Sequence, residues 1–261
     1  MPRFAANVSL LYPEHPLLDR IGAAARDGFA AMEVQAPYAV AATEFRRALA
    51  DARCEAVLMN APVGGFAGGE RGIAALPGRE REFDAAAERA LDYARTIGAP
   101  RVHVLAGSPP LEASHDDALA AYRRNIGHAA ALFGRHGIAL MIEPLNRRDM
   151  PGYFLHTLPL AMDVIESMPA PGPRLQFDFY HLQIIGGDLL RSLEASFAQI
   201  GHVQIAGVPQ RNEPDTGELN YVALLRALDR LGYAGWVGCE YRPARRGPHA
   251  TSAGLGWLRR L

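Results

Sequence analysis

Four polar residues lie at or near the ends of four successive apolar segments in the second half of the chain. They are Glu143, Asp178, Gln204 and Glu240, and each segment is short and has the composition of a buried strand. If these strands run parallel, their carboxyl ends emerge on one face of the sheet, so the four side chains meet there. Carboxylates that close together require a cation, and all-oxygen ligands favour Mg²⁺ or Mn²⁺ over zinc. The residues therefore predict a divalent metal site.

Three further side chains are candidates for binding a substrate. His181 follows Asp178 by three residues, and we expect it to orient the substrate rather than to bind the metal. Arg71 lies in a loop flanked by Gly69 and Gly72, and its planar guanidinium could bind a substrate carboxylate if that segment closes as a lid. Asn7 ends the first apolar segment and could hydrogen-bond a substrate hydroxyl. His103, inside another apolar segment, is expected to be structural.

Strand-like and helical patterns alternate along the whole chain. The strand-like segments are Phe4–Asn7, Ala31–Val34, Glu55–Met59, Arg101–Leu105, Ala139–Glu143, Leu175–Asp178, His202–Ile205 and Trp236–Glu240. The helical patterns between and after them are Leu17–Arg26, Thr43–Ala52, Phe83–Thr96, Ser114–His136, Thr157–Met168, Asp188–Ala198, Tyr221–Leu231 and Ser252–Leu261. Thr43 and Ser114 are expected to cap their helices. Eight such units predict a single (β/α)₈ TIM barrel over residues 1–261.

The main structural alternative is an open, doubly wound sheet. That fold would require a glycine-rich phosphate-binding turn after the first strand, and no glycine follows until Gly22. The longest irregular segment, Asn60–Arg79, follows the third strand and is predicted to be a lid, with Phe66, Ile73 and Leu76 as apolar anchors.

Composition excludes several classes of protein. A net charge of −1 argues against a nucleic-acid partner, and the chain has no lysine for a Schiff base. The two cysteines, Cys54 and Cys239, lie in strand-like segments and predict buried thiols rather than a disulfide framework. No apolar segment is long enough for a membrane span or signal peptide, so we expect a cytoplasmic protein with no membrane partner. The sequence leaves open whether it forms a homo-oligomer.

Motifs spread over nearly the whole chain resemble those of the hydroxypyruvate isomerase family, within the xylose isomerase-like TIM barrel enzymes. They are Arg3–Asn7, Ala67–Ala74, Pro77–Glu80, Ile142–Asn146, Gln176–His181, His202–Ala206, Glu213–Tyr221 and Gly235–Tyr241. The resemblance implies that Glu143 and Glu240 act as proton donor and acceptor around a divalent metal. It also implies that Asp178 and Gln204 complete the ligand set and that the substrate is a small hydroxy-keto acid.

The expected reaction interconverts hydroxypyruvate and tartronate semialdehyde by proton transfer through a cis-enediol. The alternatives within the superfamily are a 2-oxo-tetronate isomerase and another isomerase or epimerase of sugars or sugar acids. The chain departs from its relatives at Ala36–Val40 and Gly64–Phe66, and these departures leave the substrate open.

Two alternatives come from other classes of protein. An AP-endonuclease-like DNA-repair enzyme shares the barrel and an Asp-x-x-His motif like Asp178–His181, but it requires several histidine ligands. Here Gln204 and Asn60 occupy strand ends where histidines would serve. The third option is a sugar-binding barrel without catalytic activity.

Overall fold

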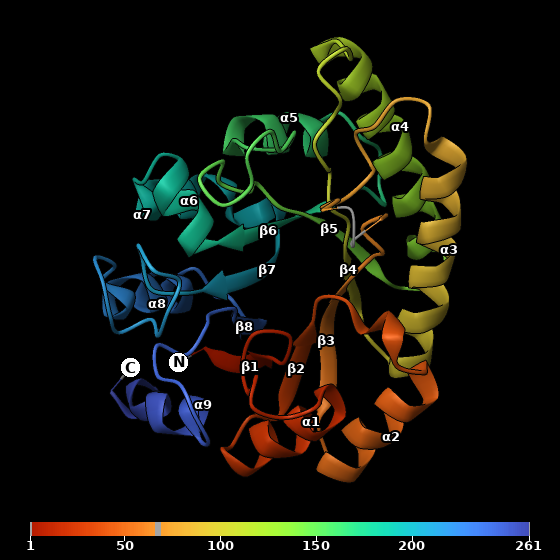
Figure 1. Cartoon of the computed structure of the whole chain (residues 1–261). Helices are drawn as coiled ribbons and strands as arrows, with labels where there is room; N and C mark the ends of the chain where they lie inside the picture. The colour runs from red at the N-terminus through yellow and green to blue at the C-terminus, as the bar shows by residue number, and fades with distance from the viewer. Residues whose placement is uncertain (1, 66–68, 261) are drawn as a thin grey trace.

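The chain forms a closed barrel of parallel strands surrounded by helices (Figure 1). The computed structural model describes residues 2–65 and 69–260. Each strand pairs with the next along the chain, and β1 pairs with β8 to close the sheet. The strands are β1 (Arg3–Asn7), β2 (Ala31–Val34), β3 (Glu55–Asn60), β4 (Arg101–His103), β5 (Ala139–Ile142), β6 (Arg174–Asp178), β7 (Ile200–Ile205) and β8 (Trp236–Cys239). The predicted TIM barrel is confirmed.

Helices follow the strands and cover the outside of the barrel. The α-helices are α1 (Leu17–Arg26), α2 (Ala42–Ala52), α3 (Glu80–Ile97), α4 (His115–Gly134), α5 (Leu158–Glu166), α6 (Phe179–Ile185), α7 (Leu189–Ser196), α8 (Tyr221–Arg230) and α9 (Ala250–Gly254). Short 3₁₀ turns are η1 (Pro37–Ala39), η3 (Phe197–Gln199) and η4 (Leu255–Arg259). Among the described residues, none of these helices has the length and apolarity that crossing a membrane requires.

Three local expectations differ from the structure. Thr43 does not cap α2, because the helix begins at Ala42 and no side chain caps it. The predicted helix Ser252–Leu261 is divided, with one α-helical turn in α9 followed by the 3₁₀ turn η4. The short helix α6 was not predicted, because it continues directly from β6 without a loop.

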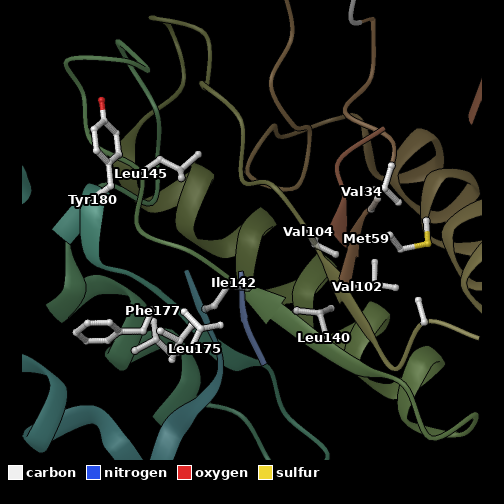
Figure 2. Packing of buried hydrophobic residues seen from close by; sticks show 14 of the residues in the cluster. Val34, Met59, Val102, Val104, Leu140, Ile142, Leu145, Leu175, Phe177 and Tyr180 are labelled. Atoms are coloured by element: carbon white, nitrogen blue, oxygen red, sulfur yellow. The ribbon is translucent and has the colours of Figure 1, made fainter. Parts of the chain in front are cut away.

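Alternation along β6 shows how the strands serve both the core and the site. Leu175 and Phe177 are fully buried apolar residues of the core (Figure 2). The Phe177 ring packs edge-on against Phe179 at the start of α6. Burying each such side chain stabilises the fold by about 1.5–3 kcal/mol. Because strand side chains alternate in direction, Gln176 and Asp178 point into the barrel instead. The apolar residues thus hold the strand in place while the polar ones face the centre.

The segment between β3 and α3 is seated on the barrel by buried apolar side chains. Ile73 and Leu76 are buried, as expected for anchors, whereas Phe66 lies outside the described residues. Gly72 forms an antiparallel bridge with Ala106, next to the end of β4. The bridge and the anchors fix the residues on either side of Gly72 above the carboxyl ends of the strands.

Candidate active site

Three carboxylates converge at the carboxyl-terminal rim of the barrel. Glu143 directly follows β5, Asp178 is the last residue of β6, and Glu240 directly follows β8. All three are at most 5% exposed. One ligand atom from each of them and one from His181 lie within 4.8 Å of one another. The parallel strands therefore bring together side chains that are far apart in the sequence.

Two oxygens of this cluster, Glu143 Oε1 and Asp178 Oδ2, are buried and have no hydrogen-bond partner among the described residues. A buried polar group without a partner costs about 1–3 kcal/mol, and more when it is charged. A cation bound between the two oxygens would remove that cost. Carboxylate and amide oxygens are the ligands that hard divalent ions prefer. The residues therefore fit the metal site, and Glu143, Asp178, Gln204 and Glu240 could hold the ion.

The surroundings raise the pKa values of two of these carboxyl groups. Burial, with the charges of Glu240 and Asp178 adding to it, raises the pKa of Glu143 well above its usual range. Burial also raises the pKa of Asp178 to about 7, against the opposing effect of Arg211. A bound metal favours the ionised forms, so metal binding to this cluster should release protons.

The amide of Gln204 is held in one orientation by two neighbours. Its Nε2 donates to Glu33 Oε2 at 2.8 Å, and its Oε1 accepts a hydrogen bond from Gln176 Nε2 at 2.7 Å. Gln176 Nε2 also donates to Glu143 Oε2 at 2.8 Å. The amide oxygen of Gln204 is thus on the side of Glu143, where a second lone pair remains for a cation.

His181 differs from the carboxylates in the chemistry it can supply. Its Nδ1 accepts a hydrogen bond from the backbone N–H of Asn146 at 3.1 Å, and burial lowers its pKa well below the usual value. The ring is therefore neutral, with its proton on Nε2, which lies 3.8 Å from Asp178 Oδ2. A protonated nitrogen cannot ligate a metal but can donate to a substrate oxygen. That the ring orients a substrate stays a prediction.

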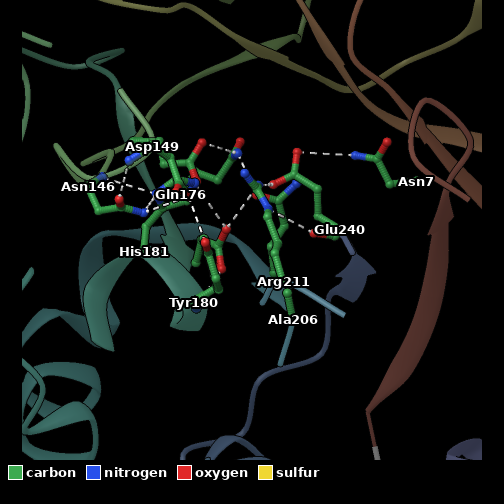
Figure 3. Close-up of polar contacts among 12 residues, drawn as sticks. Asn7, Asn146, Asp149, Gln176, Tyr180, His181, Ala206, Arg211 and Glu240 are labelled. Carbon is green, nitrogen blue, oxygen red and sulfur yellow. Dashed lines mark hydrogen bonds and ion pairs between the residues drawn. The ribbon is translucent and has the colours of Figure 1, made fainter. Parts of the chain in front are cut away.

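Arg211, which sequence reasoning missed, is the cation of the cluster. It lies in the loop after β7 with a left-handed backbone, and its Nη2 forms an ion pair with Glu240 Oε2 and lies 3.8 Å from Asp178 Oδ2. Its guanidinium stacks over the Tyr180 ring at 5.0 Å (Figure 3). Burial lowers the pKa of Arg211, but the charges of Glu240 and Asp178 outweigh burial and raise it. Nothing in the local sequence distinguishes this arginine from a solvated loop charge.

A cavity of about 530 Å³ opens onto these groups. Its lining includes Glu143, His181, Arg211 and Glu240, and also Arg71 from the segment that precedes α3. The Arg71 Nη1 donates to the carbonyl of Glu70 at 2.9 Å. The structure therefore brings Arg71 to the same cavity as the carboxylates, and its binding of a substrate stays a prediction.

Asn7 lies behind Glu240 and is not among the lining residues of this cavity. Its Nδ2 donates to Glu33 Oε2 at 3.1 Å and to Glu240 Oε1 at 3.3 Å, and its Oδ1 accepts from the backbone of Ser9. Gln35, a residue that we did not predict, also donates to Glu240 Oε1. Because its polar atoms are engaged by the protein, Asn7 is better suited to orient Glu240 than to bind a substrate hydroxyl.

Two other residues of the site were not identified from the sequence. His103, expected to be structural, lines the cavity, and its Nδ1 lies 3.5 Å from Glu143 Oε2. Burial lowers the pKa of His103 to about 3, so the ring is neutral. Glu33 is fully buried within β2. Glu33 could have been predicted from its place in the sequence, because a glutamate inside the apolar segment Ala31–Val34 is unusual.

The chain is similar to known proteins over nearly its whole length. A family model described as xylose isomerase-like TIM barrel matches residues 21–261. The chain is 51% identical to the 2-oxo-tetronate isomerase of Cupriavidus necator, covering 99% of this chain and 98% of that protein. It is 39% identical to the hydroxypyruvate isomerase of Escherichia coli, again covering 99% of this chain and 98% of the relative. A solved structure named AP endonuclease, family 2, from Brucella melitensis has a TM-score of 0.95 at 41% identity, covering 100% of this chain and 99% of that one.

Proposed function

The chain belongs to the xylose isomerase-like TIM barrel family, and from that premise we propose that it is a divalent-metal-dependent isomerase of short hydroxy-2-oxo acids. In such a reaction the carbonyl moves from carbon 2 to carbon 3. One C–H proton leaves carbon 3, another is added at carbon 2, and the hydroxyl proton moves between the two oxygens. The observation that carries the proposal is the pair of buried glutamates, Glu143 and Glu240, that line one cavity from different strands.

Each chemical requirement has a candidate group in the cavity. We assign Glu143 and Glu240 to the two proton transfers at carbon, because a positioned acid and base are needed on either side of an enediol. The bound metal supplies stabilisation of the negative charge that develops on the substrate oxygens. We assign His181 Nε2–H to hydrogen-bond one of those oxygens, because that nitrogen carries the proton.

Two arginines can bind the carboxylate of the substrate. Arg71 and Arg211 both line the cavity, from the loops that follow β3 and β7. A guanidinium binds a carboxylate through two parallel hydrogen bonds, which also fixes the orientation of carbons 2 and 3. This orientation would hold the reacting carbons beside Glu143 and Glu240.

For the substrate itself we propose a four-carbon 2-oxo-tetronate, with hydroxypyruvate as the second candidate. The relative at 51% identity is named for the former, and the relative at 39% identity is named for the latter. The cavity of about 530 Å³ has room for the additional carbon and hydroxyl. This order differs from the expectation from sequence motifs, which placed hydroxypyruvate first.

A DNA-repair endonuclease is the competing function, because the Brucella structure carries that name. We favour the isomerase on the composition of the site. None of the four residues that we assign to the metal is a histidine, and Gln204 and Asn60 occupy rim positions on β7 and β3. The net charge of −1 also provides no general attraction for a DNA backbone.

The test is an assay of the purified protein with both acids in parallel, after treatment with a chelator and after addition of Mg²⁺ or Mn²⁺. We expect metal-dependent isomerisation with the higher kcat/KM for the 2-oxo-tetronate. A higher value for hydroxypyruvate would reverse the order of substrates. Cleavage of DNA containing abasic sites, with no isomerisation of either acid, would overturn the proposed function.

A further inference from the structure

The interior of the barrel directly beneath the carboxylate rim is polar. Barrel interiors are usually filled by branched apolar side chains. Here β2, β6 and β7 place buried polar residues there, which are Glu33, Gln176, His202 and Gln204. Buried polar groups are retained at a cost unless they are hydrogen-bonded, so their partners indicate what they do.

Glu33 is at the centre of this polar interior. Its Oε1 accepts from His202 Nε2, and its Oε2 accepts from both Gln204 Nε2 at 2.8 Å and Asn7 Nδ2 at 3.1 Å. The side chain is fully buried and is not among the lining residues of the cavity. Two of these partners, Gln204 and Asn7, belong to or contact the proposed site, whereas His202 does not line the cavity.

Hydrogen bonds through Glu33 connect the two glutamates that we assign to proton transfer. Gln176 Nε2 bridges Glu143 Oε2 and Gln204 Oε1, and Gln204 Nε2 donates to Glu33. On the other side of Glu33, the Nδ2 of Asn7 bridges from Glu33 to Glu240. The connection therefore contains no gap between Glu143 and Glu240.

The carboxylate of Glu33 decides the direction of each hydrogen bond in this connection. An ionised carboxylate can only accept, so the amide NH₂ groups of Gln204 and Asn7 must both face Glu33. The oxygen of Gln204 is consequently turned toward Gln176 and Glu143. With the amide reversed, an NH₂ group would face the carboxylate rim and repel a cation.

We propose that Glu33 is a positioning residue that fixes the amide oxygen of Gln204 as a metal ligand and, through Asn7, orients Glu240. The inference rests on the metal site of the proposed function. It goes beyond that function because it assigns a role to a residue that touches neither the cavity nor the substrate.

Gly238 on β8 supports this role from the other side of β1, which pairs with both β2 and β8. A Cβ atom at Gly238 would lie 1.8 Å from Glu33 Oε1, so a side chain there would displace the carboxylate. The absence of a side chain on β8 at this position leaves the space that Glu33 occupies. The close approach shows that the position of the Glu33 carboxylate depends on residues of two strands, β2 and β8.

The experiment compares Mn²⁺ binding, followed by EPR of the free ion, in the wild type and Glu33→Gln. We expect the dissociation constant to rise by about 10- to 100-fold, the usual effect of losing a group that orients a ligand. Glu55→Gln is the matched control. Glu55 is exposed at the start of β3, and its side chain accepts a hydrogen bond from Trp236 Nε1. The control should bind Mn²⁺ like the wild type.

An exchange of the two side chains separates orientation from general stability. In Glu33→Gln with Gln204→Glu, residue 33 donates and residue 204 accepts, and a carboxylate oxygen again faces the cation. We expect this double variant to recover most of the lost affinity. If Glu33→Gln does not fold, Glu33→Asp replaces it, because the shorter acid keeps the charge but withdraws from Gln204, and the same rise is expected.

Unchanged Mn²⁺ affinity in a folded Glu33→Gln or Glu33→Asp variant would overturn the inference. A double variant that binds no better than Glu33→Gln would also overturn it. A wild-type protein that binds no Mn²⁺ would overturn both the inference and the metal dependence. A wild-type protein that binds Mn²⁺ but isomerises neither acid would overturn the proposed function alone, because the binding comparison does not depend on the substrate.

Discussion

At the scale of single residues, Glu143 and Glu240 occupy different surroundings within one cavity. Glu240 is held by Asn7 and Gln35 at one oxygen and by the Arg211 guanidinium at the other. Glu143 accepts from Gln176, and its Oε1 has no hydrogen-bond partner in the described chain. An acid and a base that must exchange protons with neighbouring carbons benefit from unequal surroundings, because one must give a proton while the other takes one.

Replacing either glutamate by glutamine separates proton transfer from metal binding. The amide oxygen can still ligate an ion, but an amide cannot carry a proton near neutral pH. We expect Glu143→Gln and Glu240→Gln each to lower kcat by about 10²- to 10⁴-fold while Mn²⁺ binding stays measurable. Asp178→Asn should instead weaken Mn²⁺ binding first. Full recovery of the glutamate variants in excess metal would show that both residues are only ligands.

Arg71→Ala tests the group assigned to the substrate carboxylate. A hydrogen bond to a charged group contributes about 1.5–3 kcal/mol, so KM should rise by roughly 10- to 150-fold. Arg147→Ala is the control, because Arg147 is exposed and is not among the cavity lining. Equal KM values for the two variants in steady-state kinetics would show that Arg71 does not bind the substrate carboxylate.

At the scale of elements, the loop before α3 depends on Gly72 for its position. Gly72 has a φ of 113°, and a Cβ atom there would lie 2.4 Å from the carbonyl oxygen of Leu105. An alanine must therefore move the loop away from the end of β4, and Arg71 moves with it. This movement would break the bridge between Gly72 and Ala106.

Gly72→Ala should consequently raise KM nearly as much as Arg71→Ala, although it changes no group that contacts substrate. Gly78→Ala is the matched control, because Gly78 has a φ of 83° and a Cβ atom added there would meet no other atom within 4 Å. The control carries the strain of a left-handed alanine, about 1 kcal/mol, without the collision. Kinetic assays in which both glycine variants behave alike would contradict a positioning role for the bridge.

The elements themselves could largely be predicted from the sequence, and the site only in part. All eight strands were predicted because apolar segments of four or five residues between helical patterns are characteristic of a parallel barrel. The rim position of Asp178 and Glu240 followed from the ends of those segments. Arg211 could not be predicted, since its place depends on how the loop after β7 turns back. Glu33 was not predicted as a residue of the site. Its role follows from its burial, and the sequence does not show burial directly.

At the scale of the whole molecule, the site requires the barrel to be closed. Glu240 follows β8 and receives a hydrogen bond from Asn7 at the end of β1, so its position depends on the pairing of the first and last strands. His103, Glu143, Asp178 and Gln204 come from the strands between them. A cluster of carboxylates assembled in this way destabilises the metal-free fold, and the cost depends on pH.

Titration of Asp178 should lower the free energy of unfolding of the metal-free protein between pH 6 and pH 8, compared with Asp178→Asn. Asp178 has a folded pKa of about 7, raised from an unfolded value of 3.8, so its protonated form stabilises the fold at low pH. That stabilisation is lost as the pH rises through 7. The loss from this group is about 1 kcal/mol over the interval, so the Tm of the wild type should fall by roughly 2–4 °C relative to that of Asp178→Asn.

Thermal unfolding in a chelator at several pH values measures this effect. Asp178→Asn is the control, because the amide does not titrate and the variant therefore lacks the contribution of Asp178. Saturating Mg²⁺ should also reduce the fall, because the ion offsets the repulsion among the carboxylates. A difference in Tm between the wild type and Asp178→Asn that stays constant from pH 6 to pH 8 would contradict the account of the cluster.

The central claim is proton transfer by two separate glutamates, and isomerisation in D₂O tests it most directly. Each substrate is incubated with enzyme and Mg²⁺ in D₂O, and the product is examined by NMR at the first few per cent of conversion. Because one glutamate removes the proton and the other delivers a proton from solvent, we predict deuterium at the carbon that gains hydrogen in nearly every product molecule. Product that keeps the substrate hydrogen at that carbon, or no isomerised product from either acid, would contradict the account.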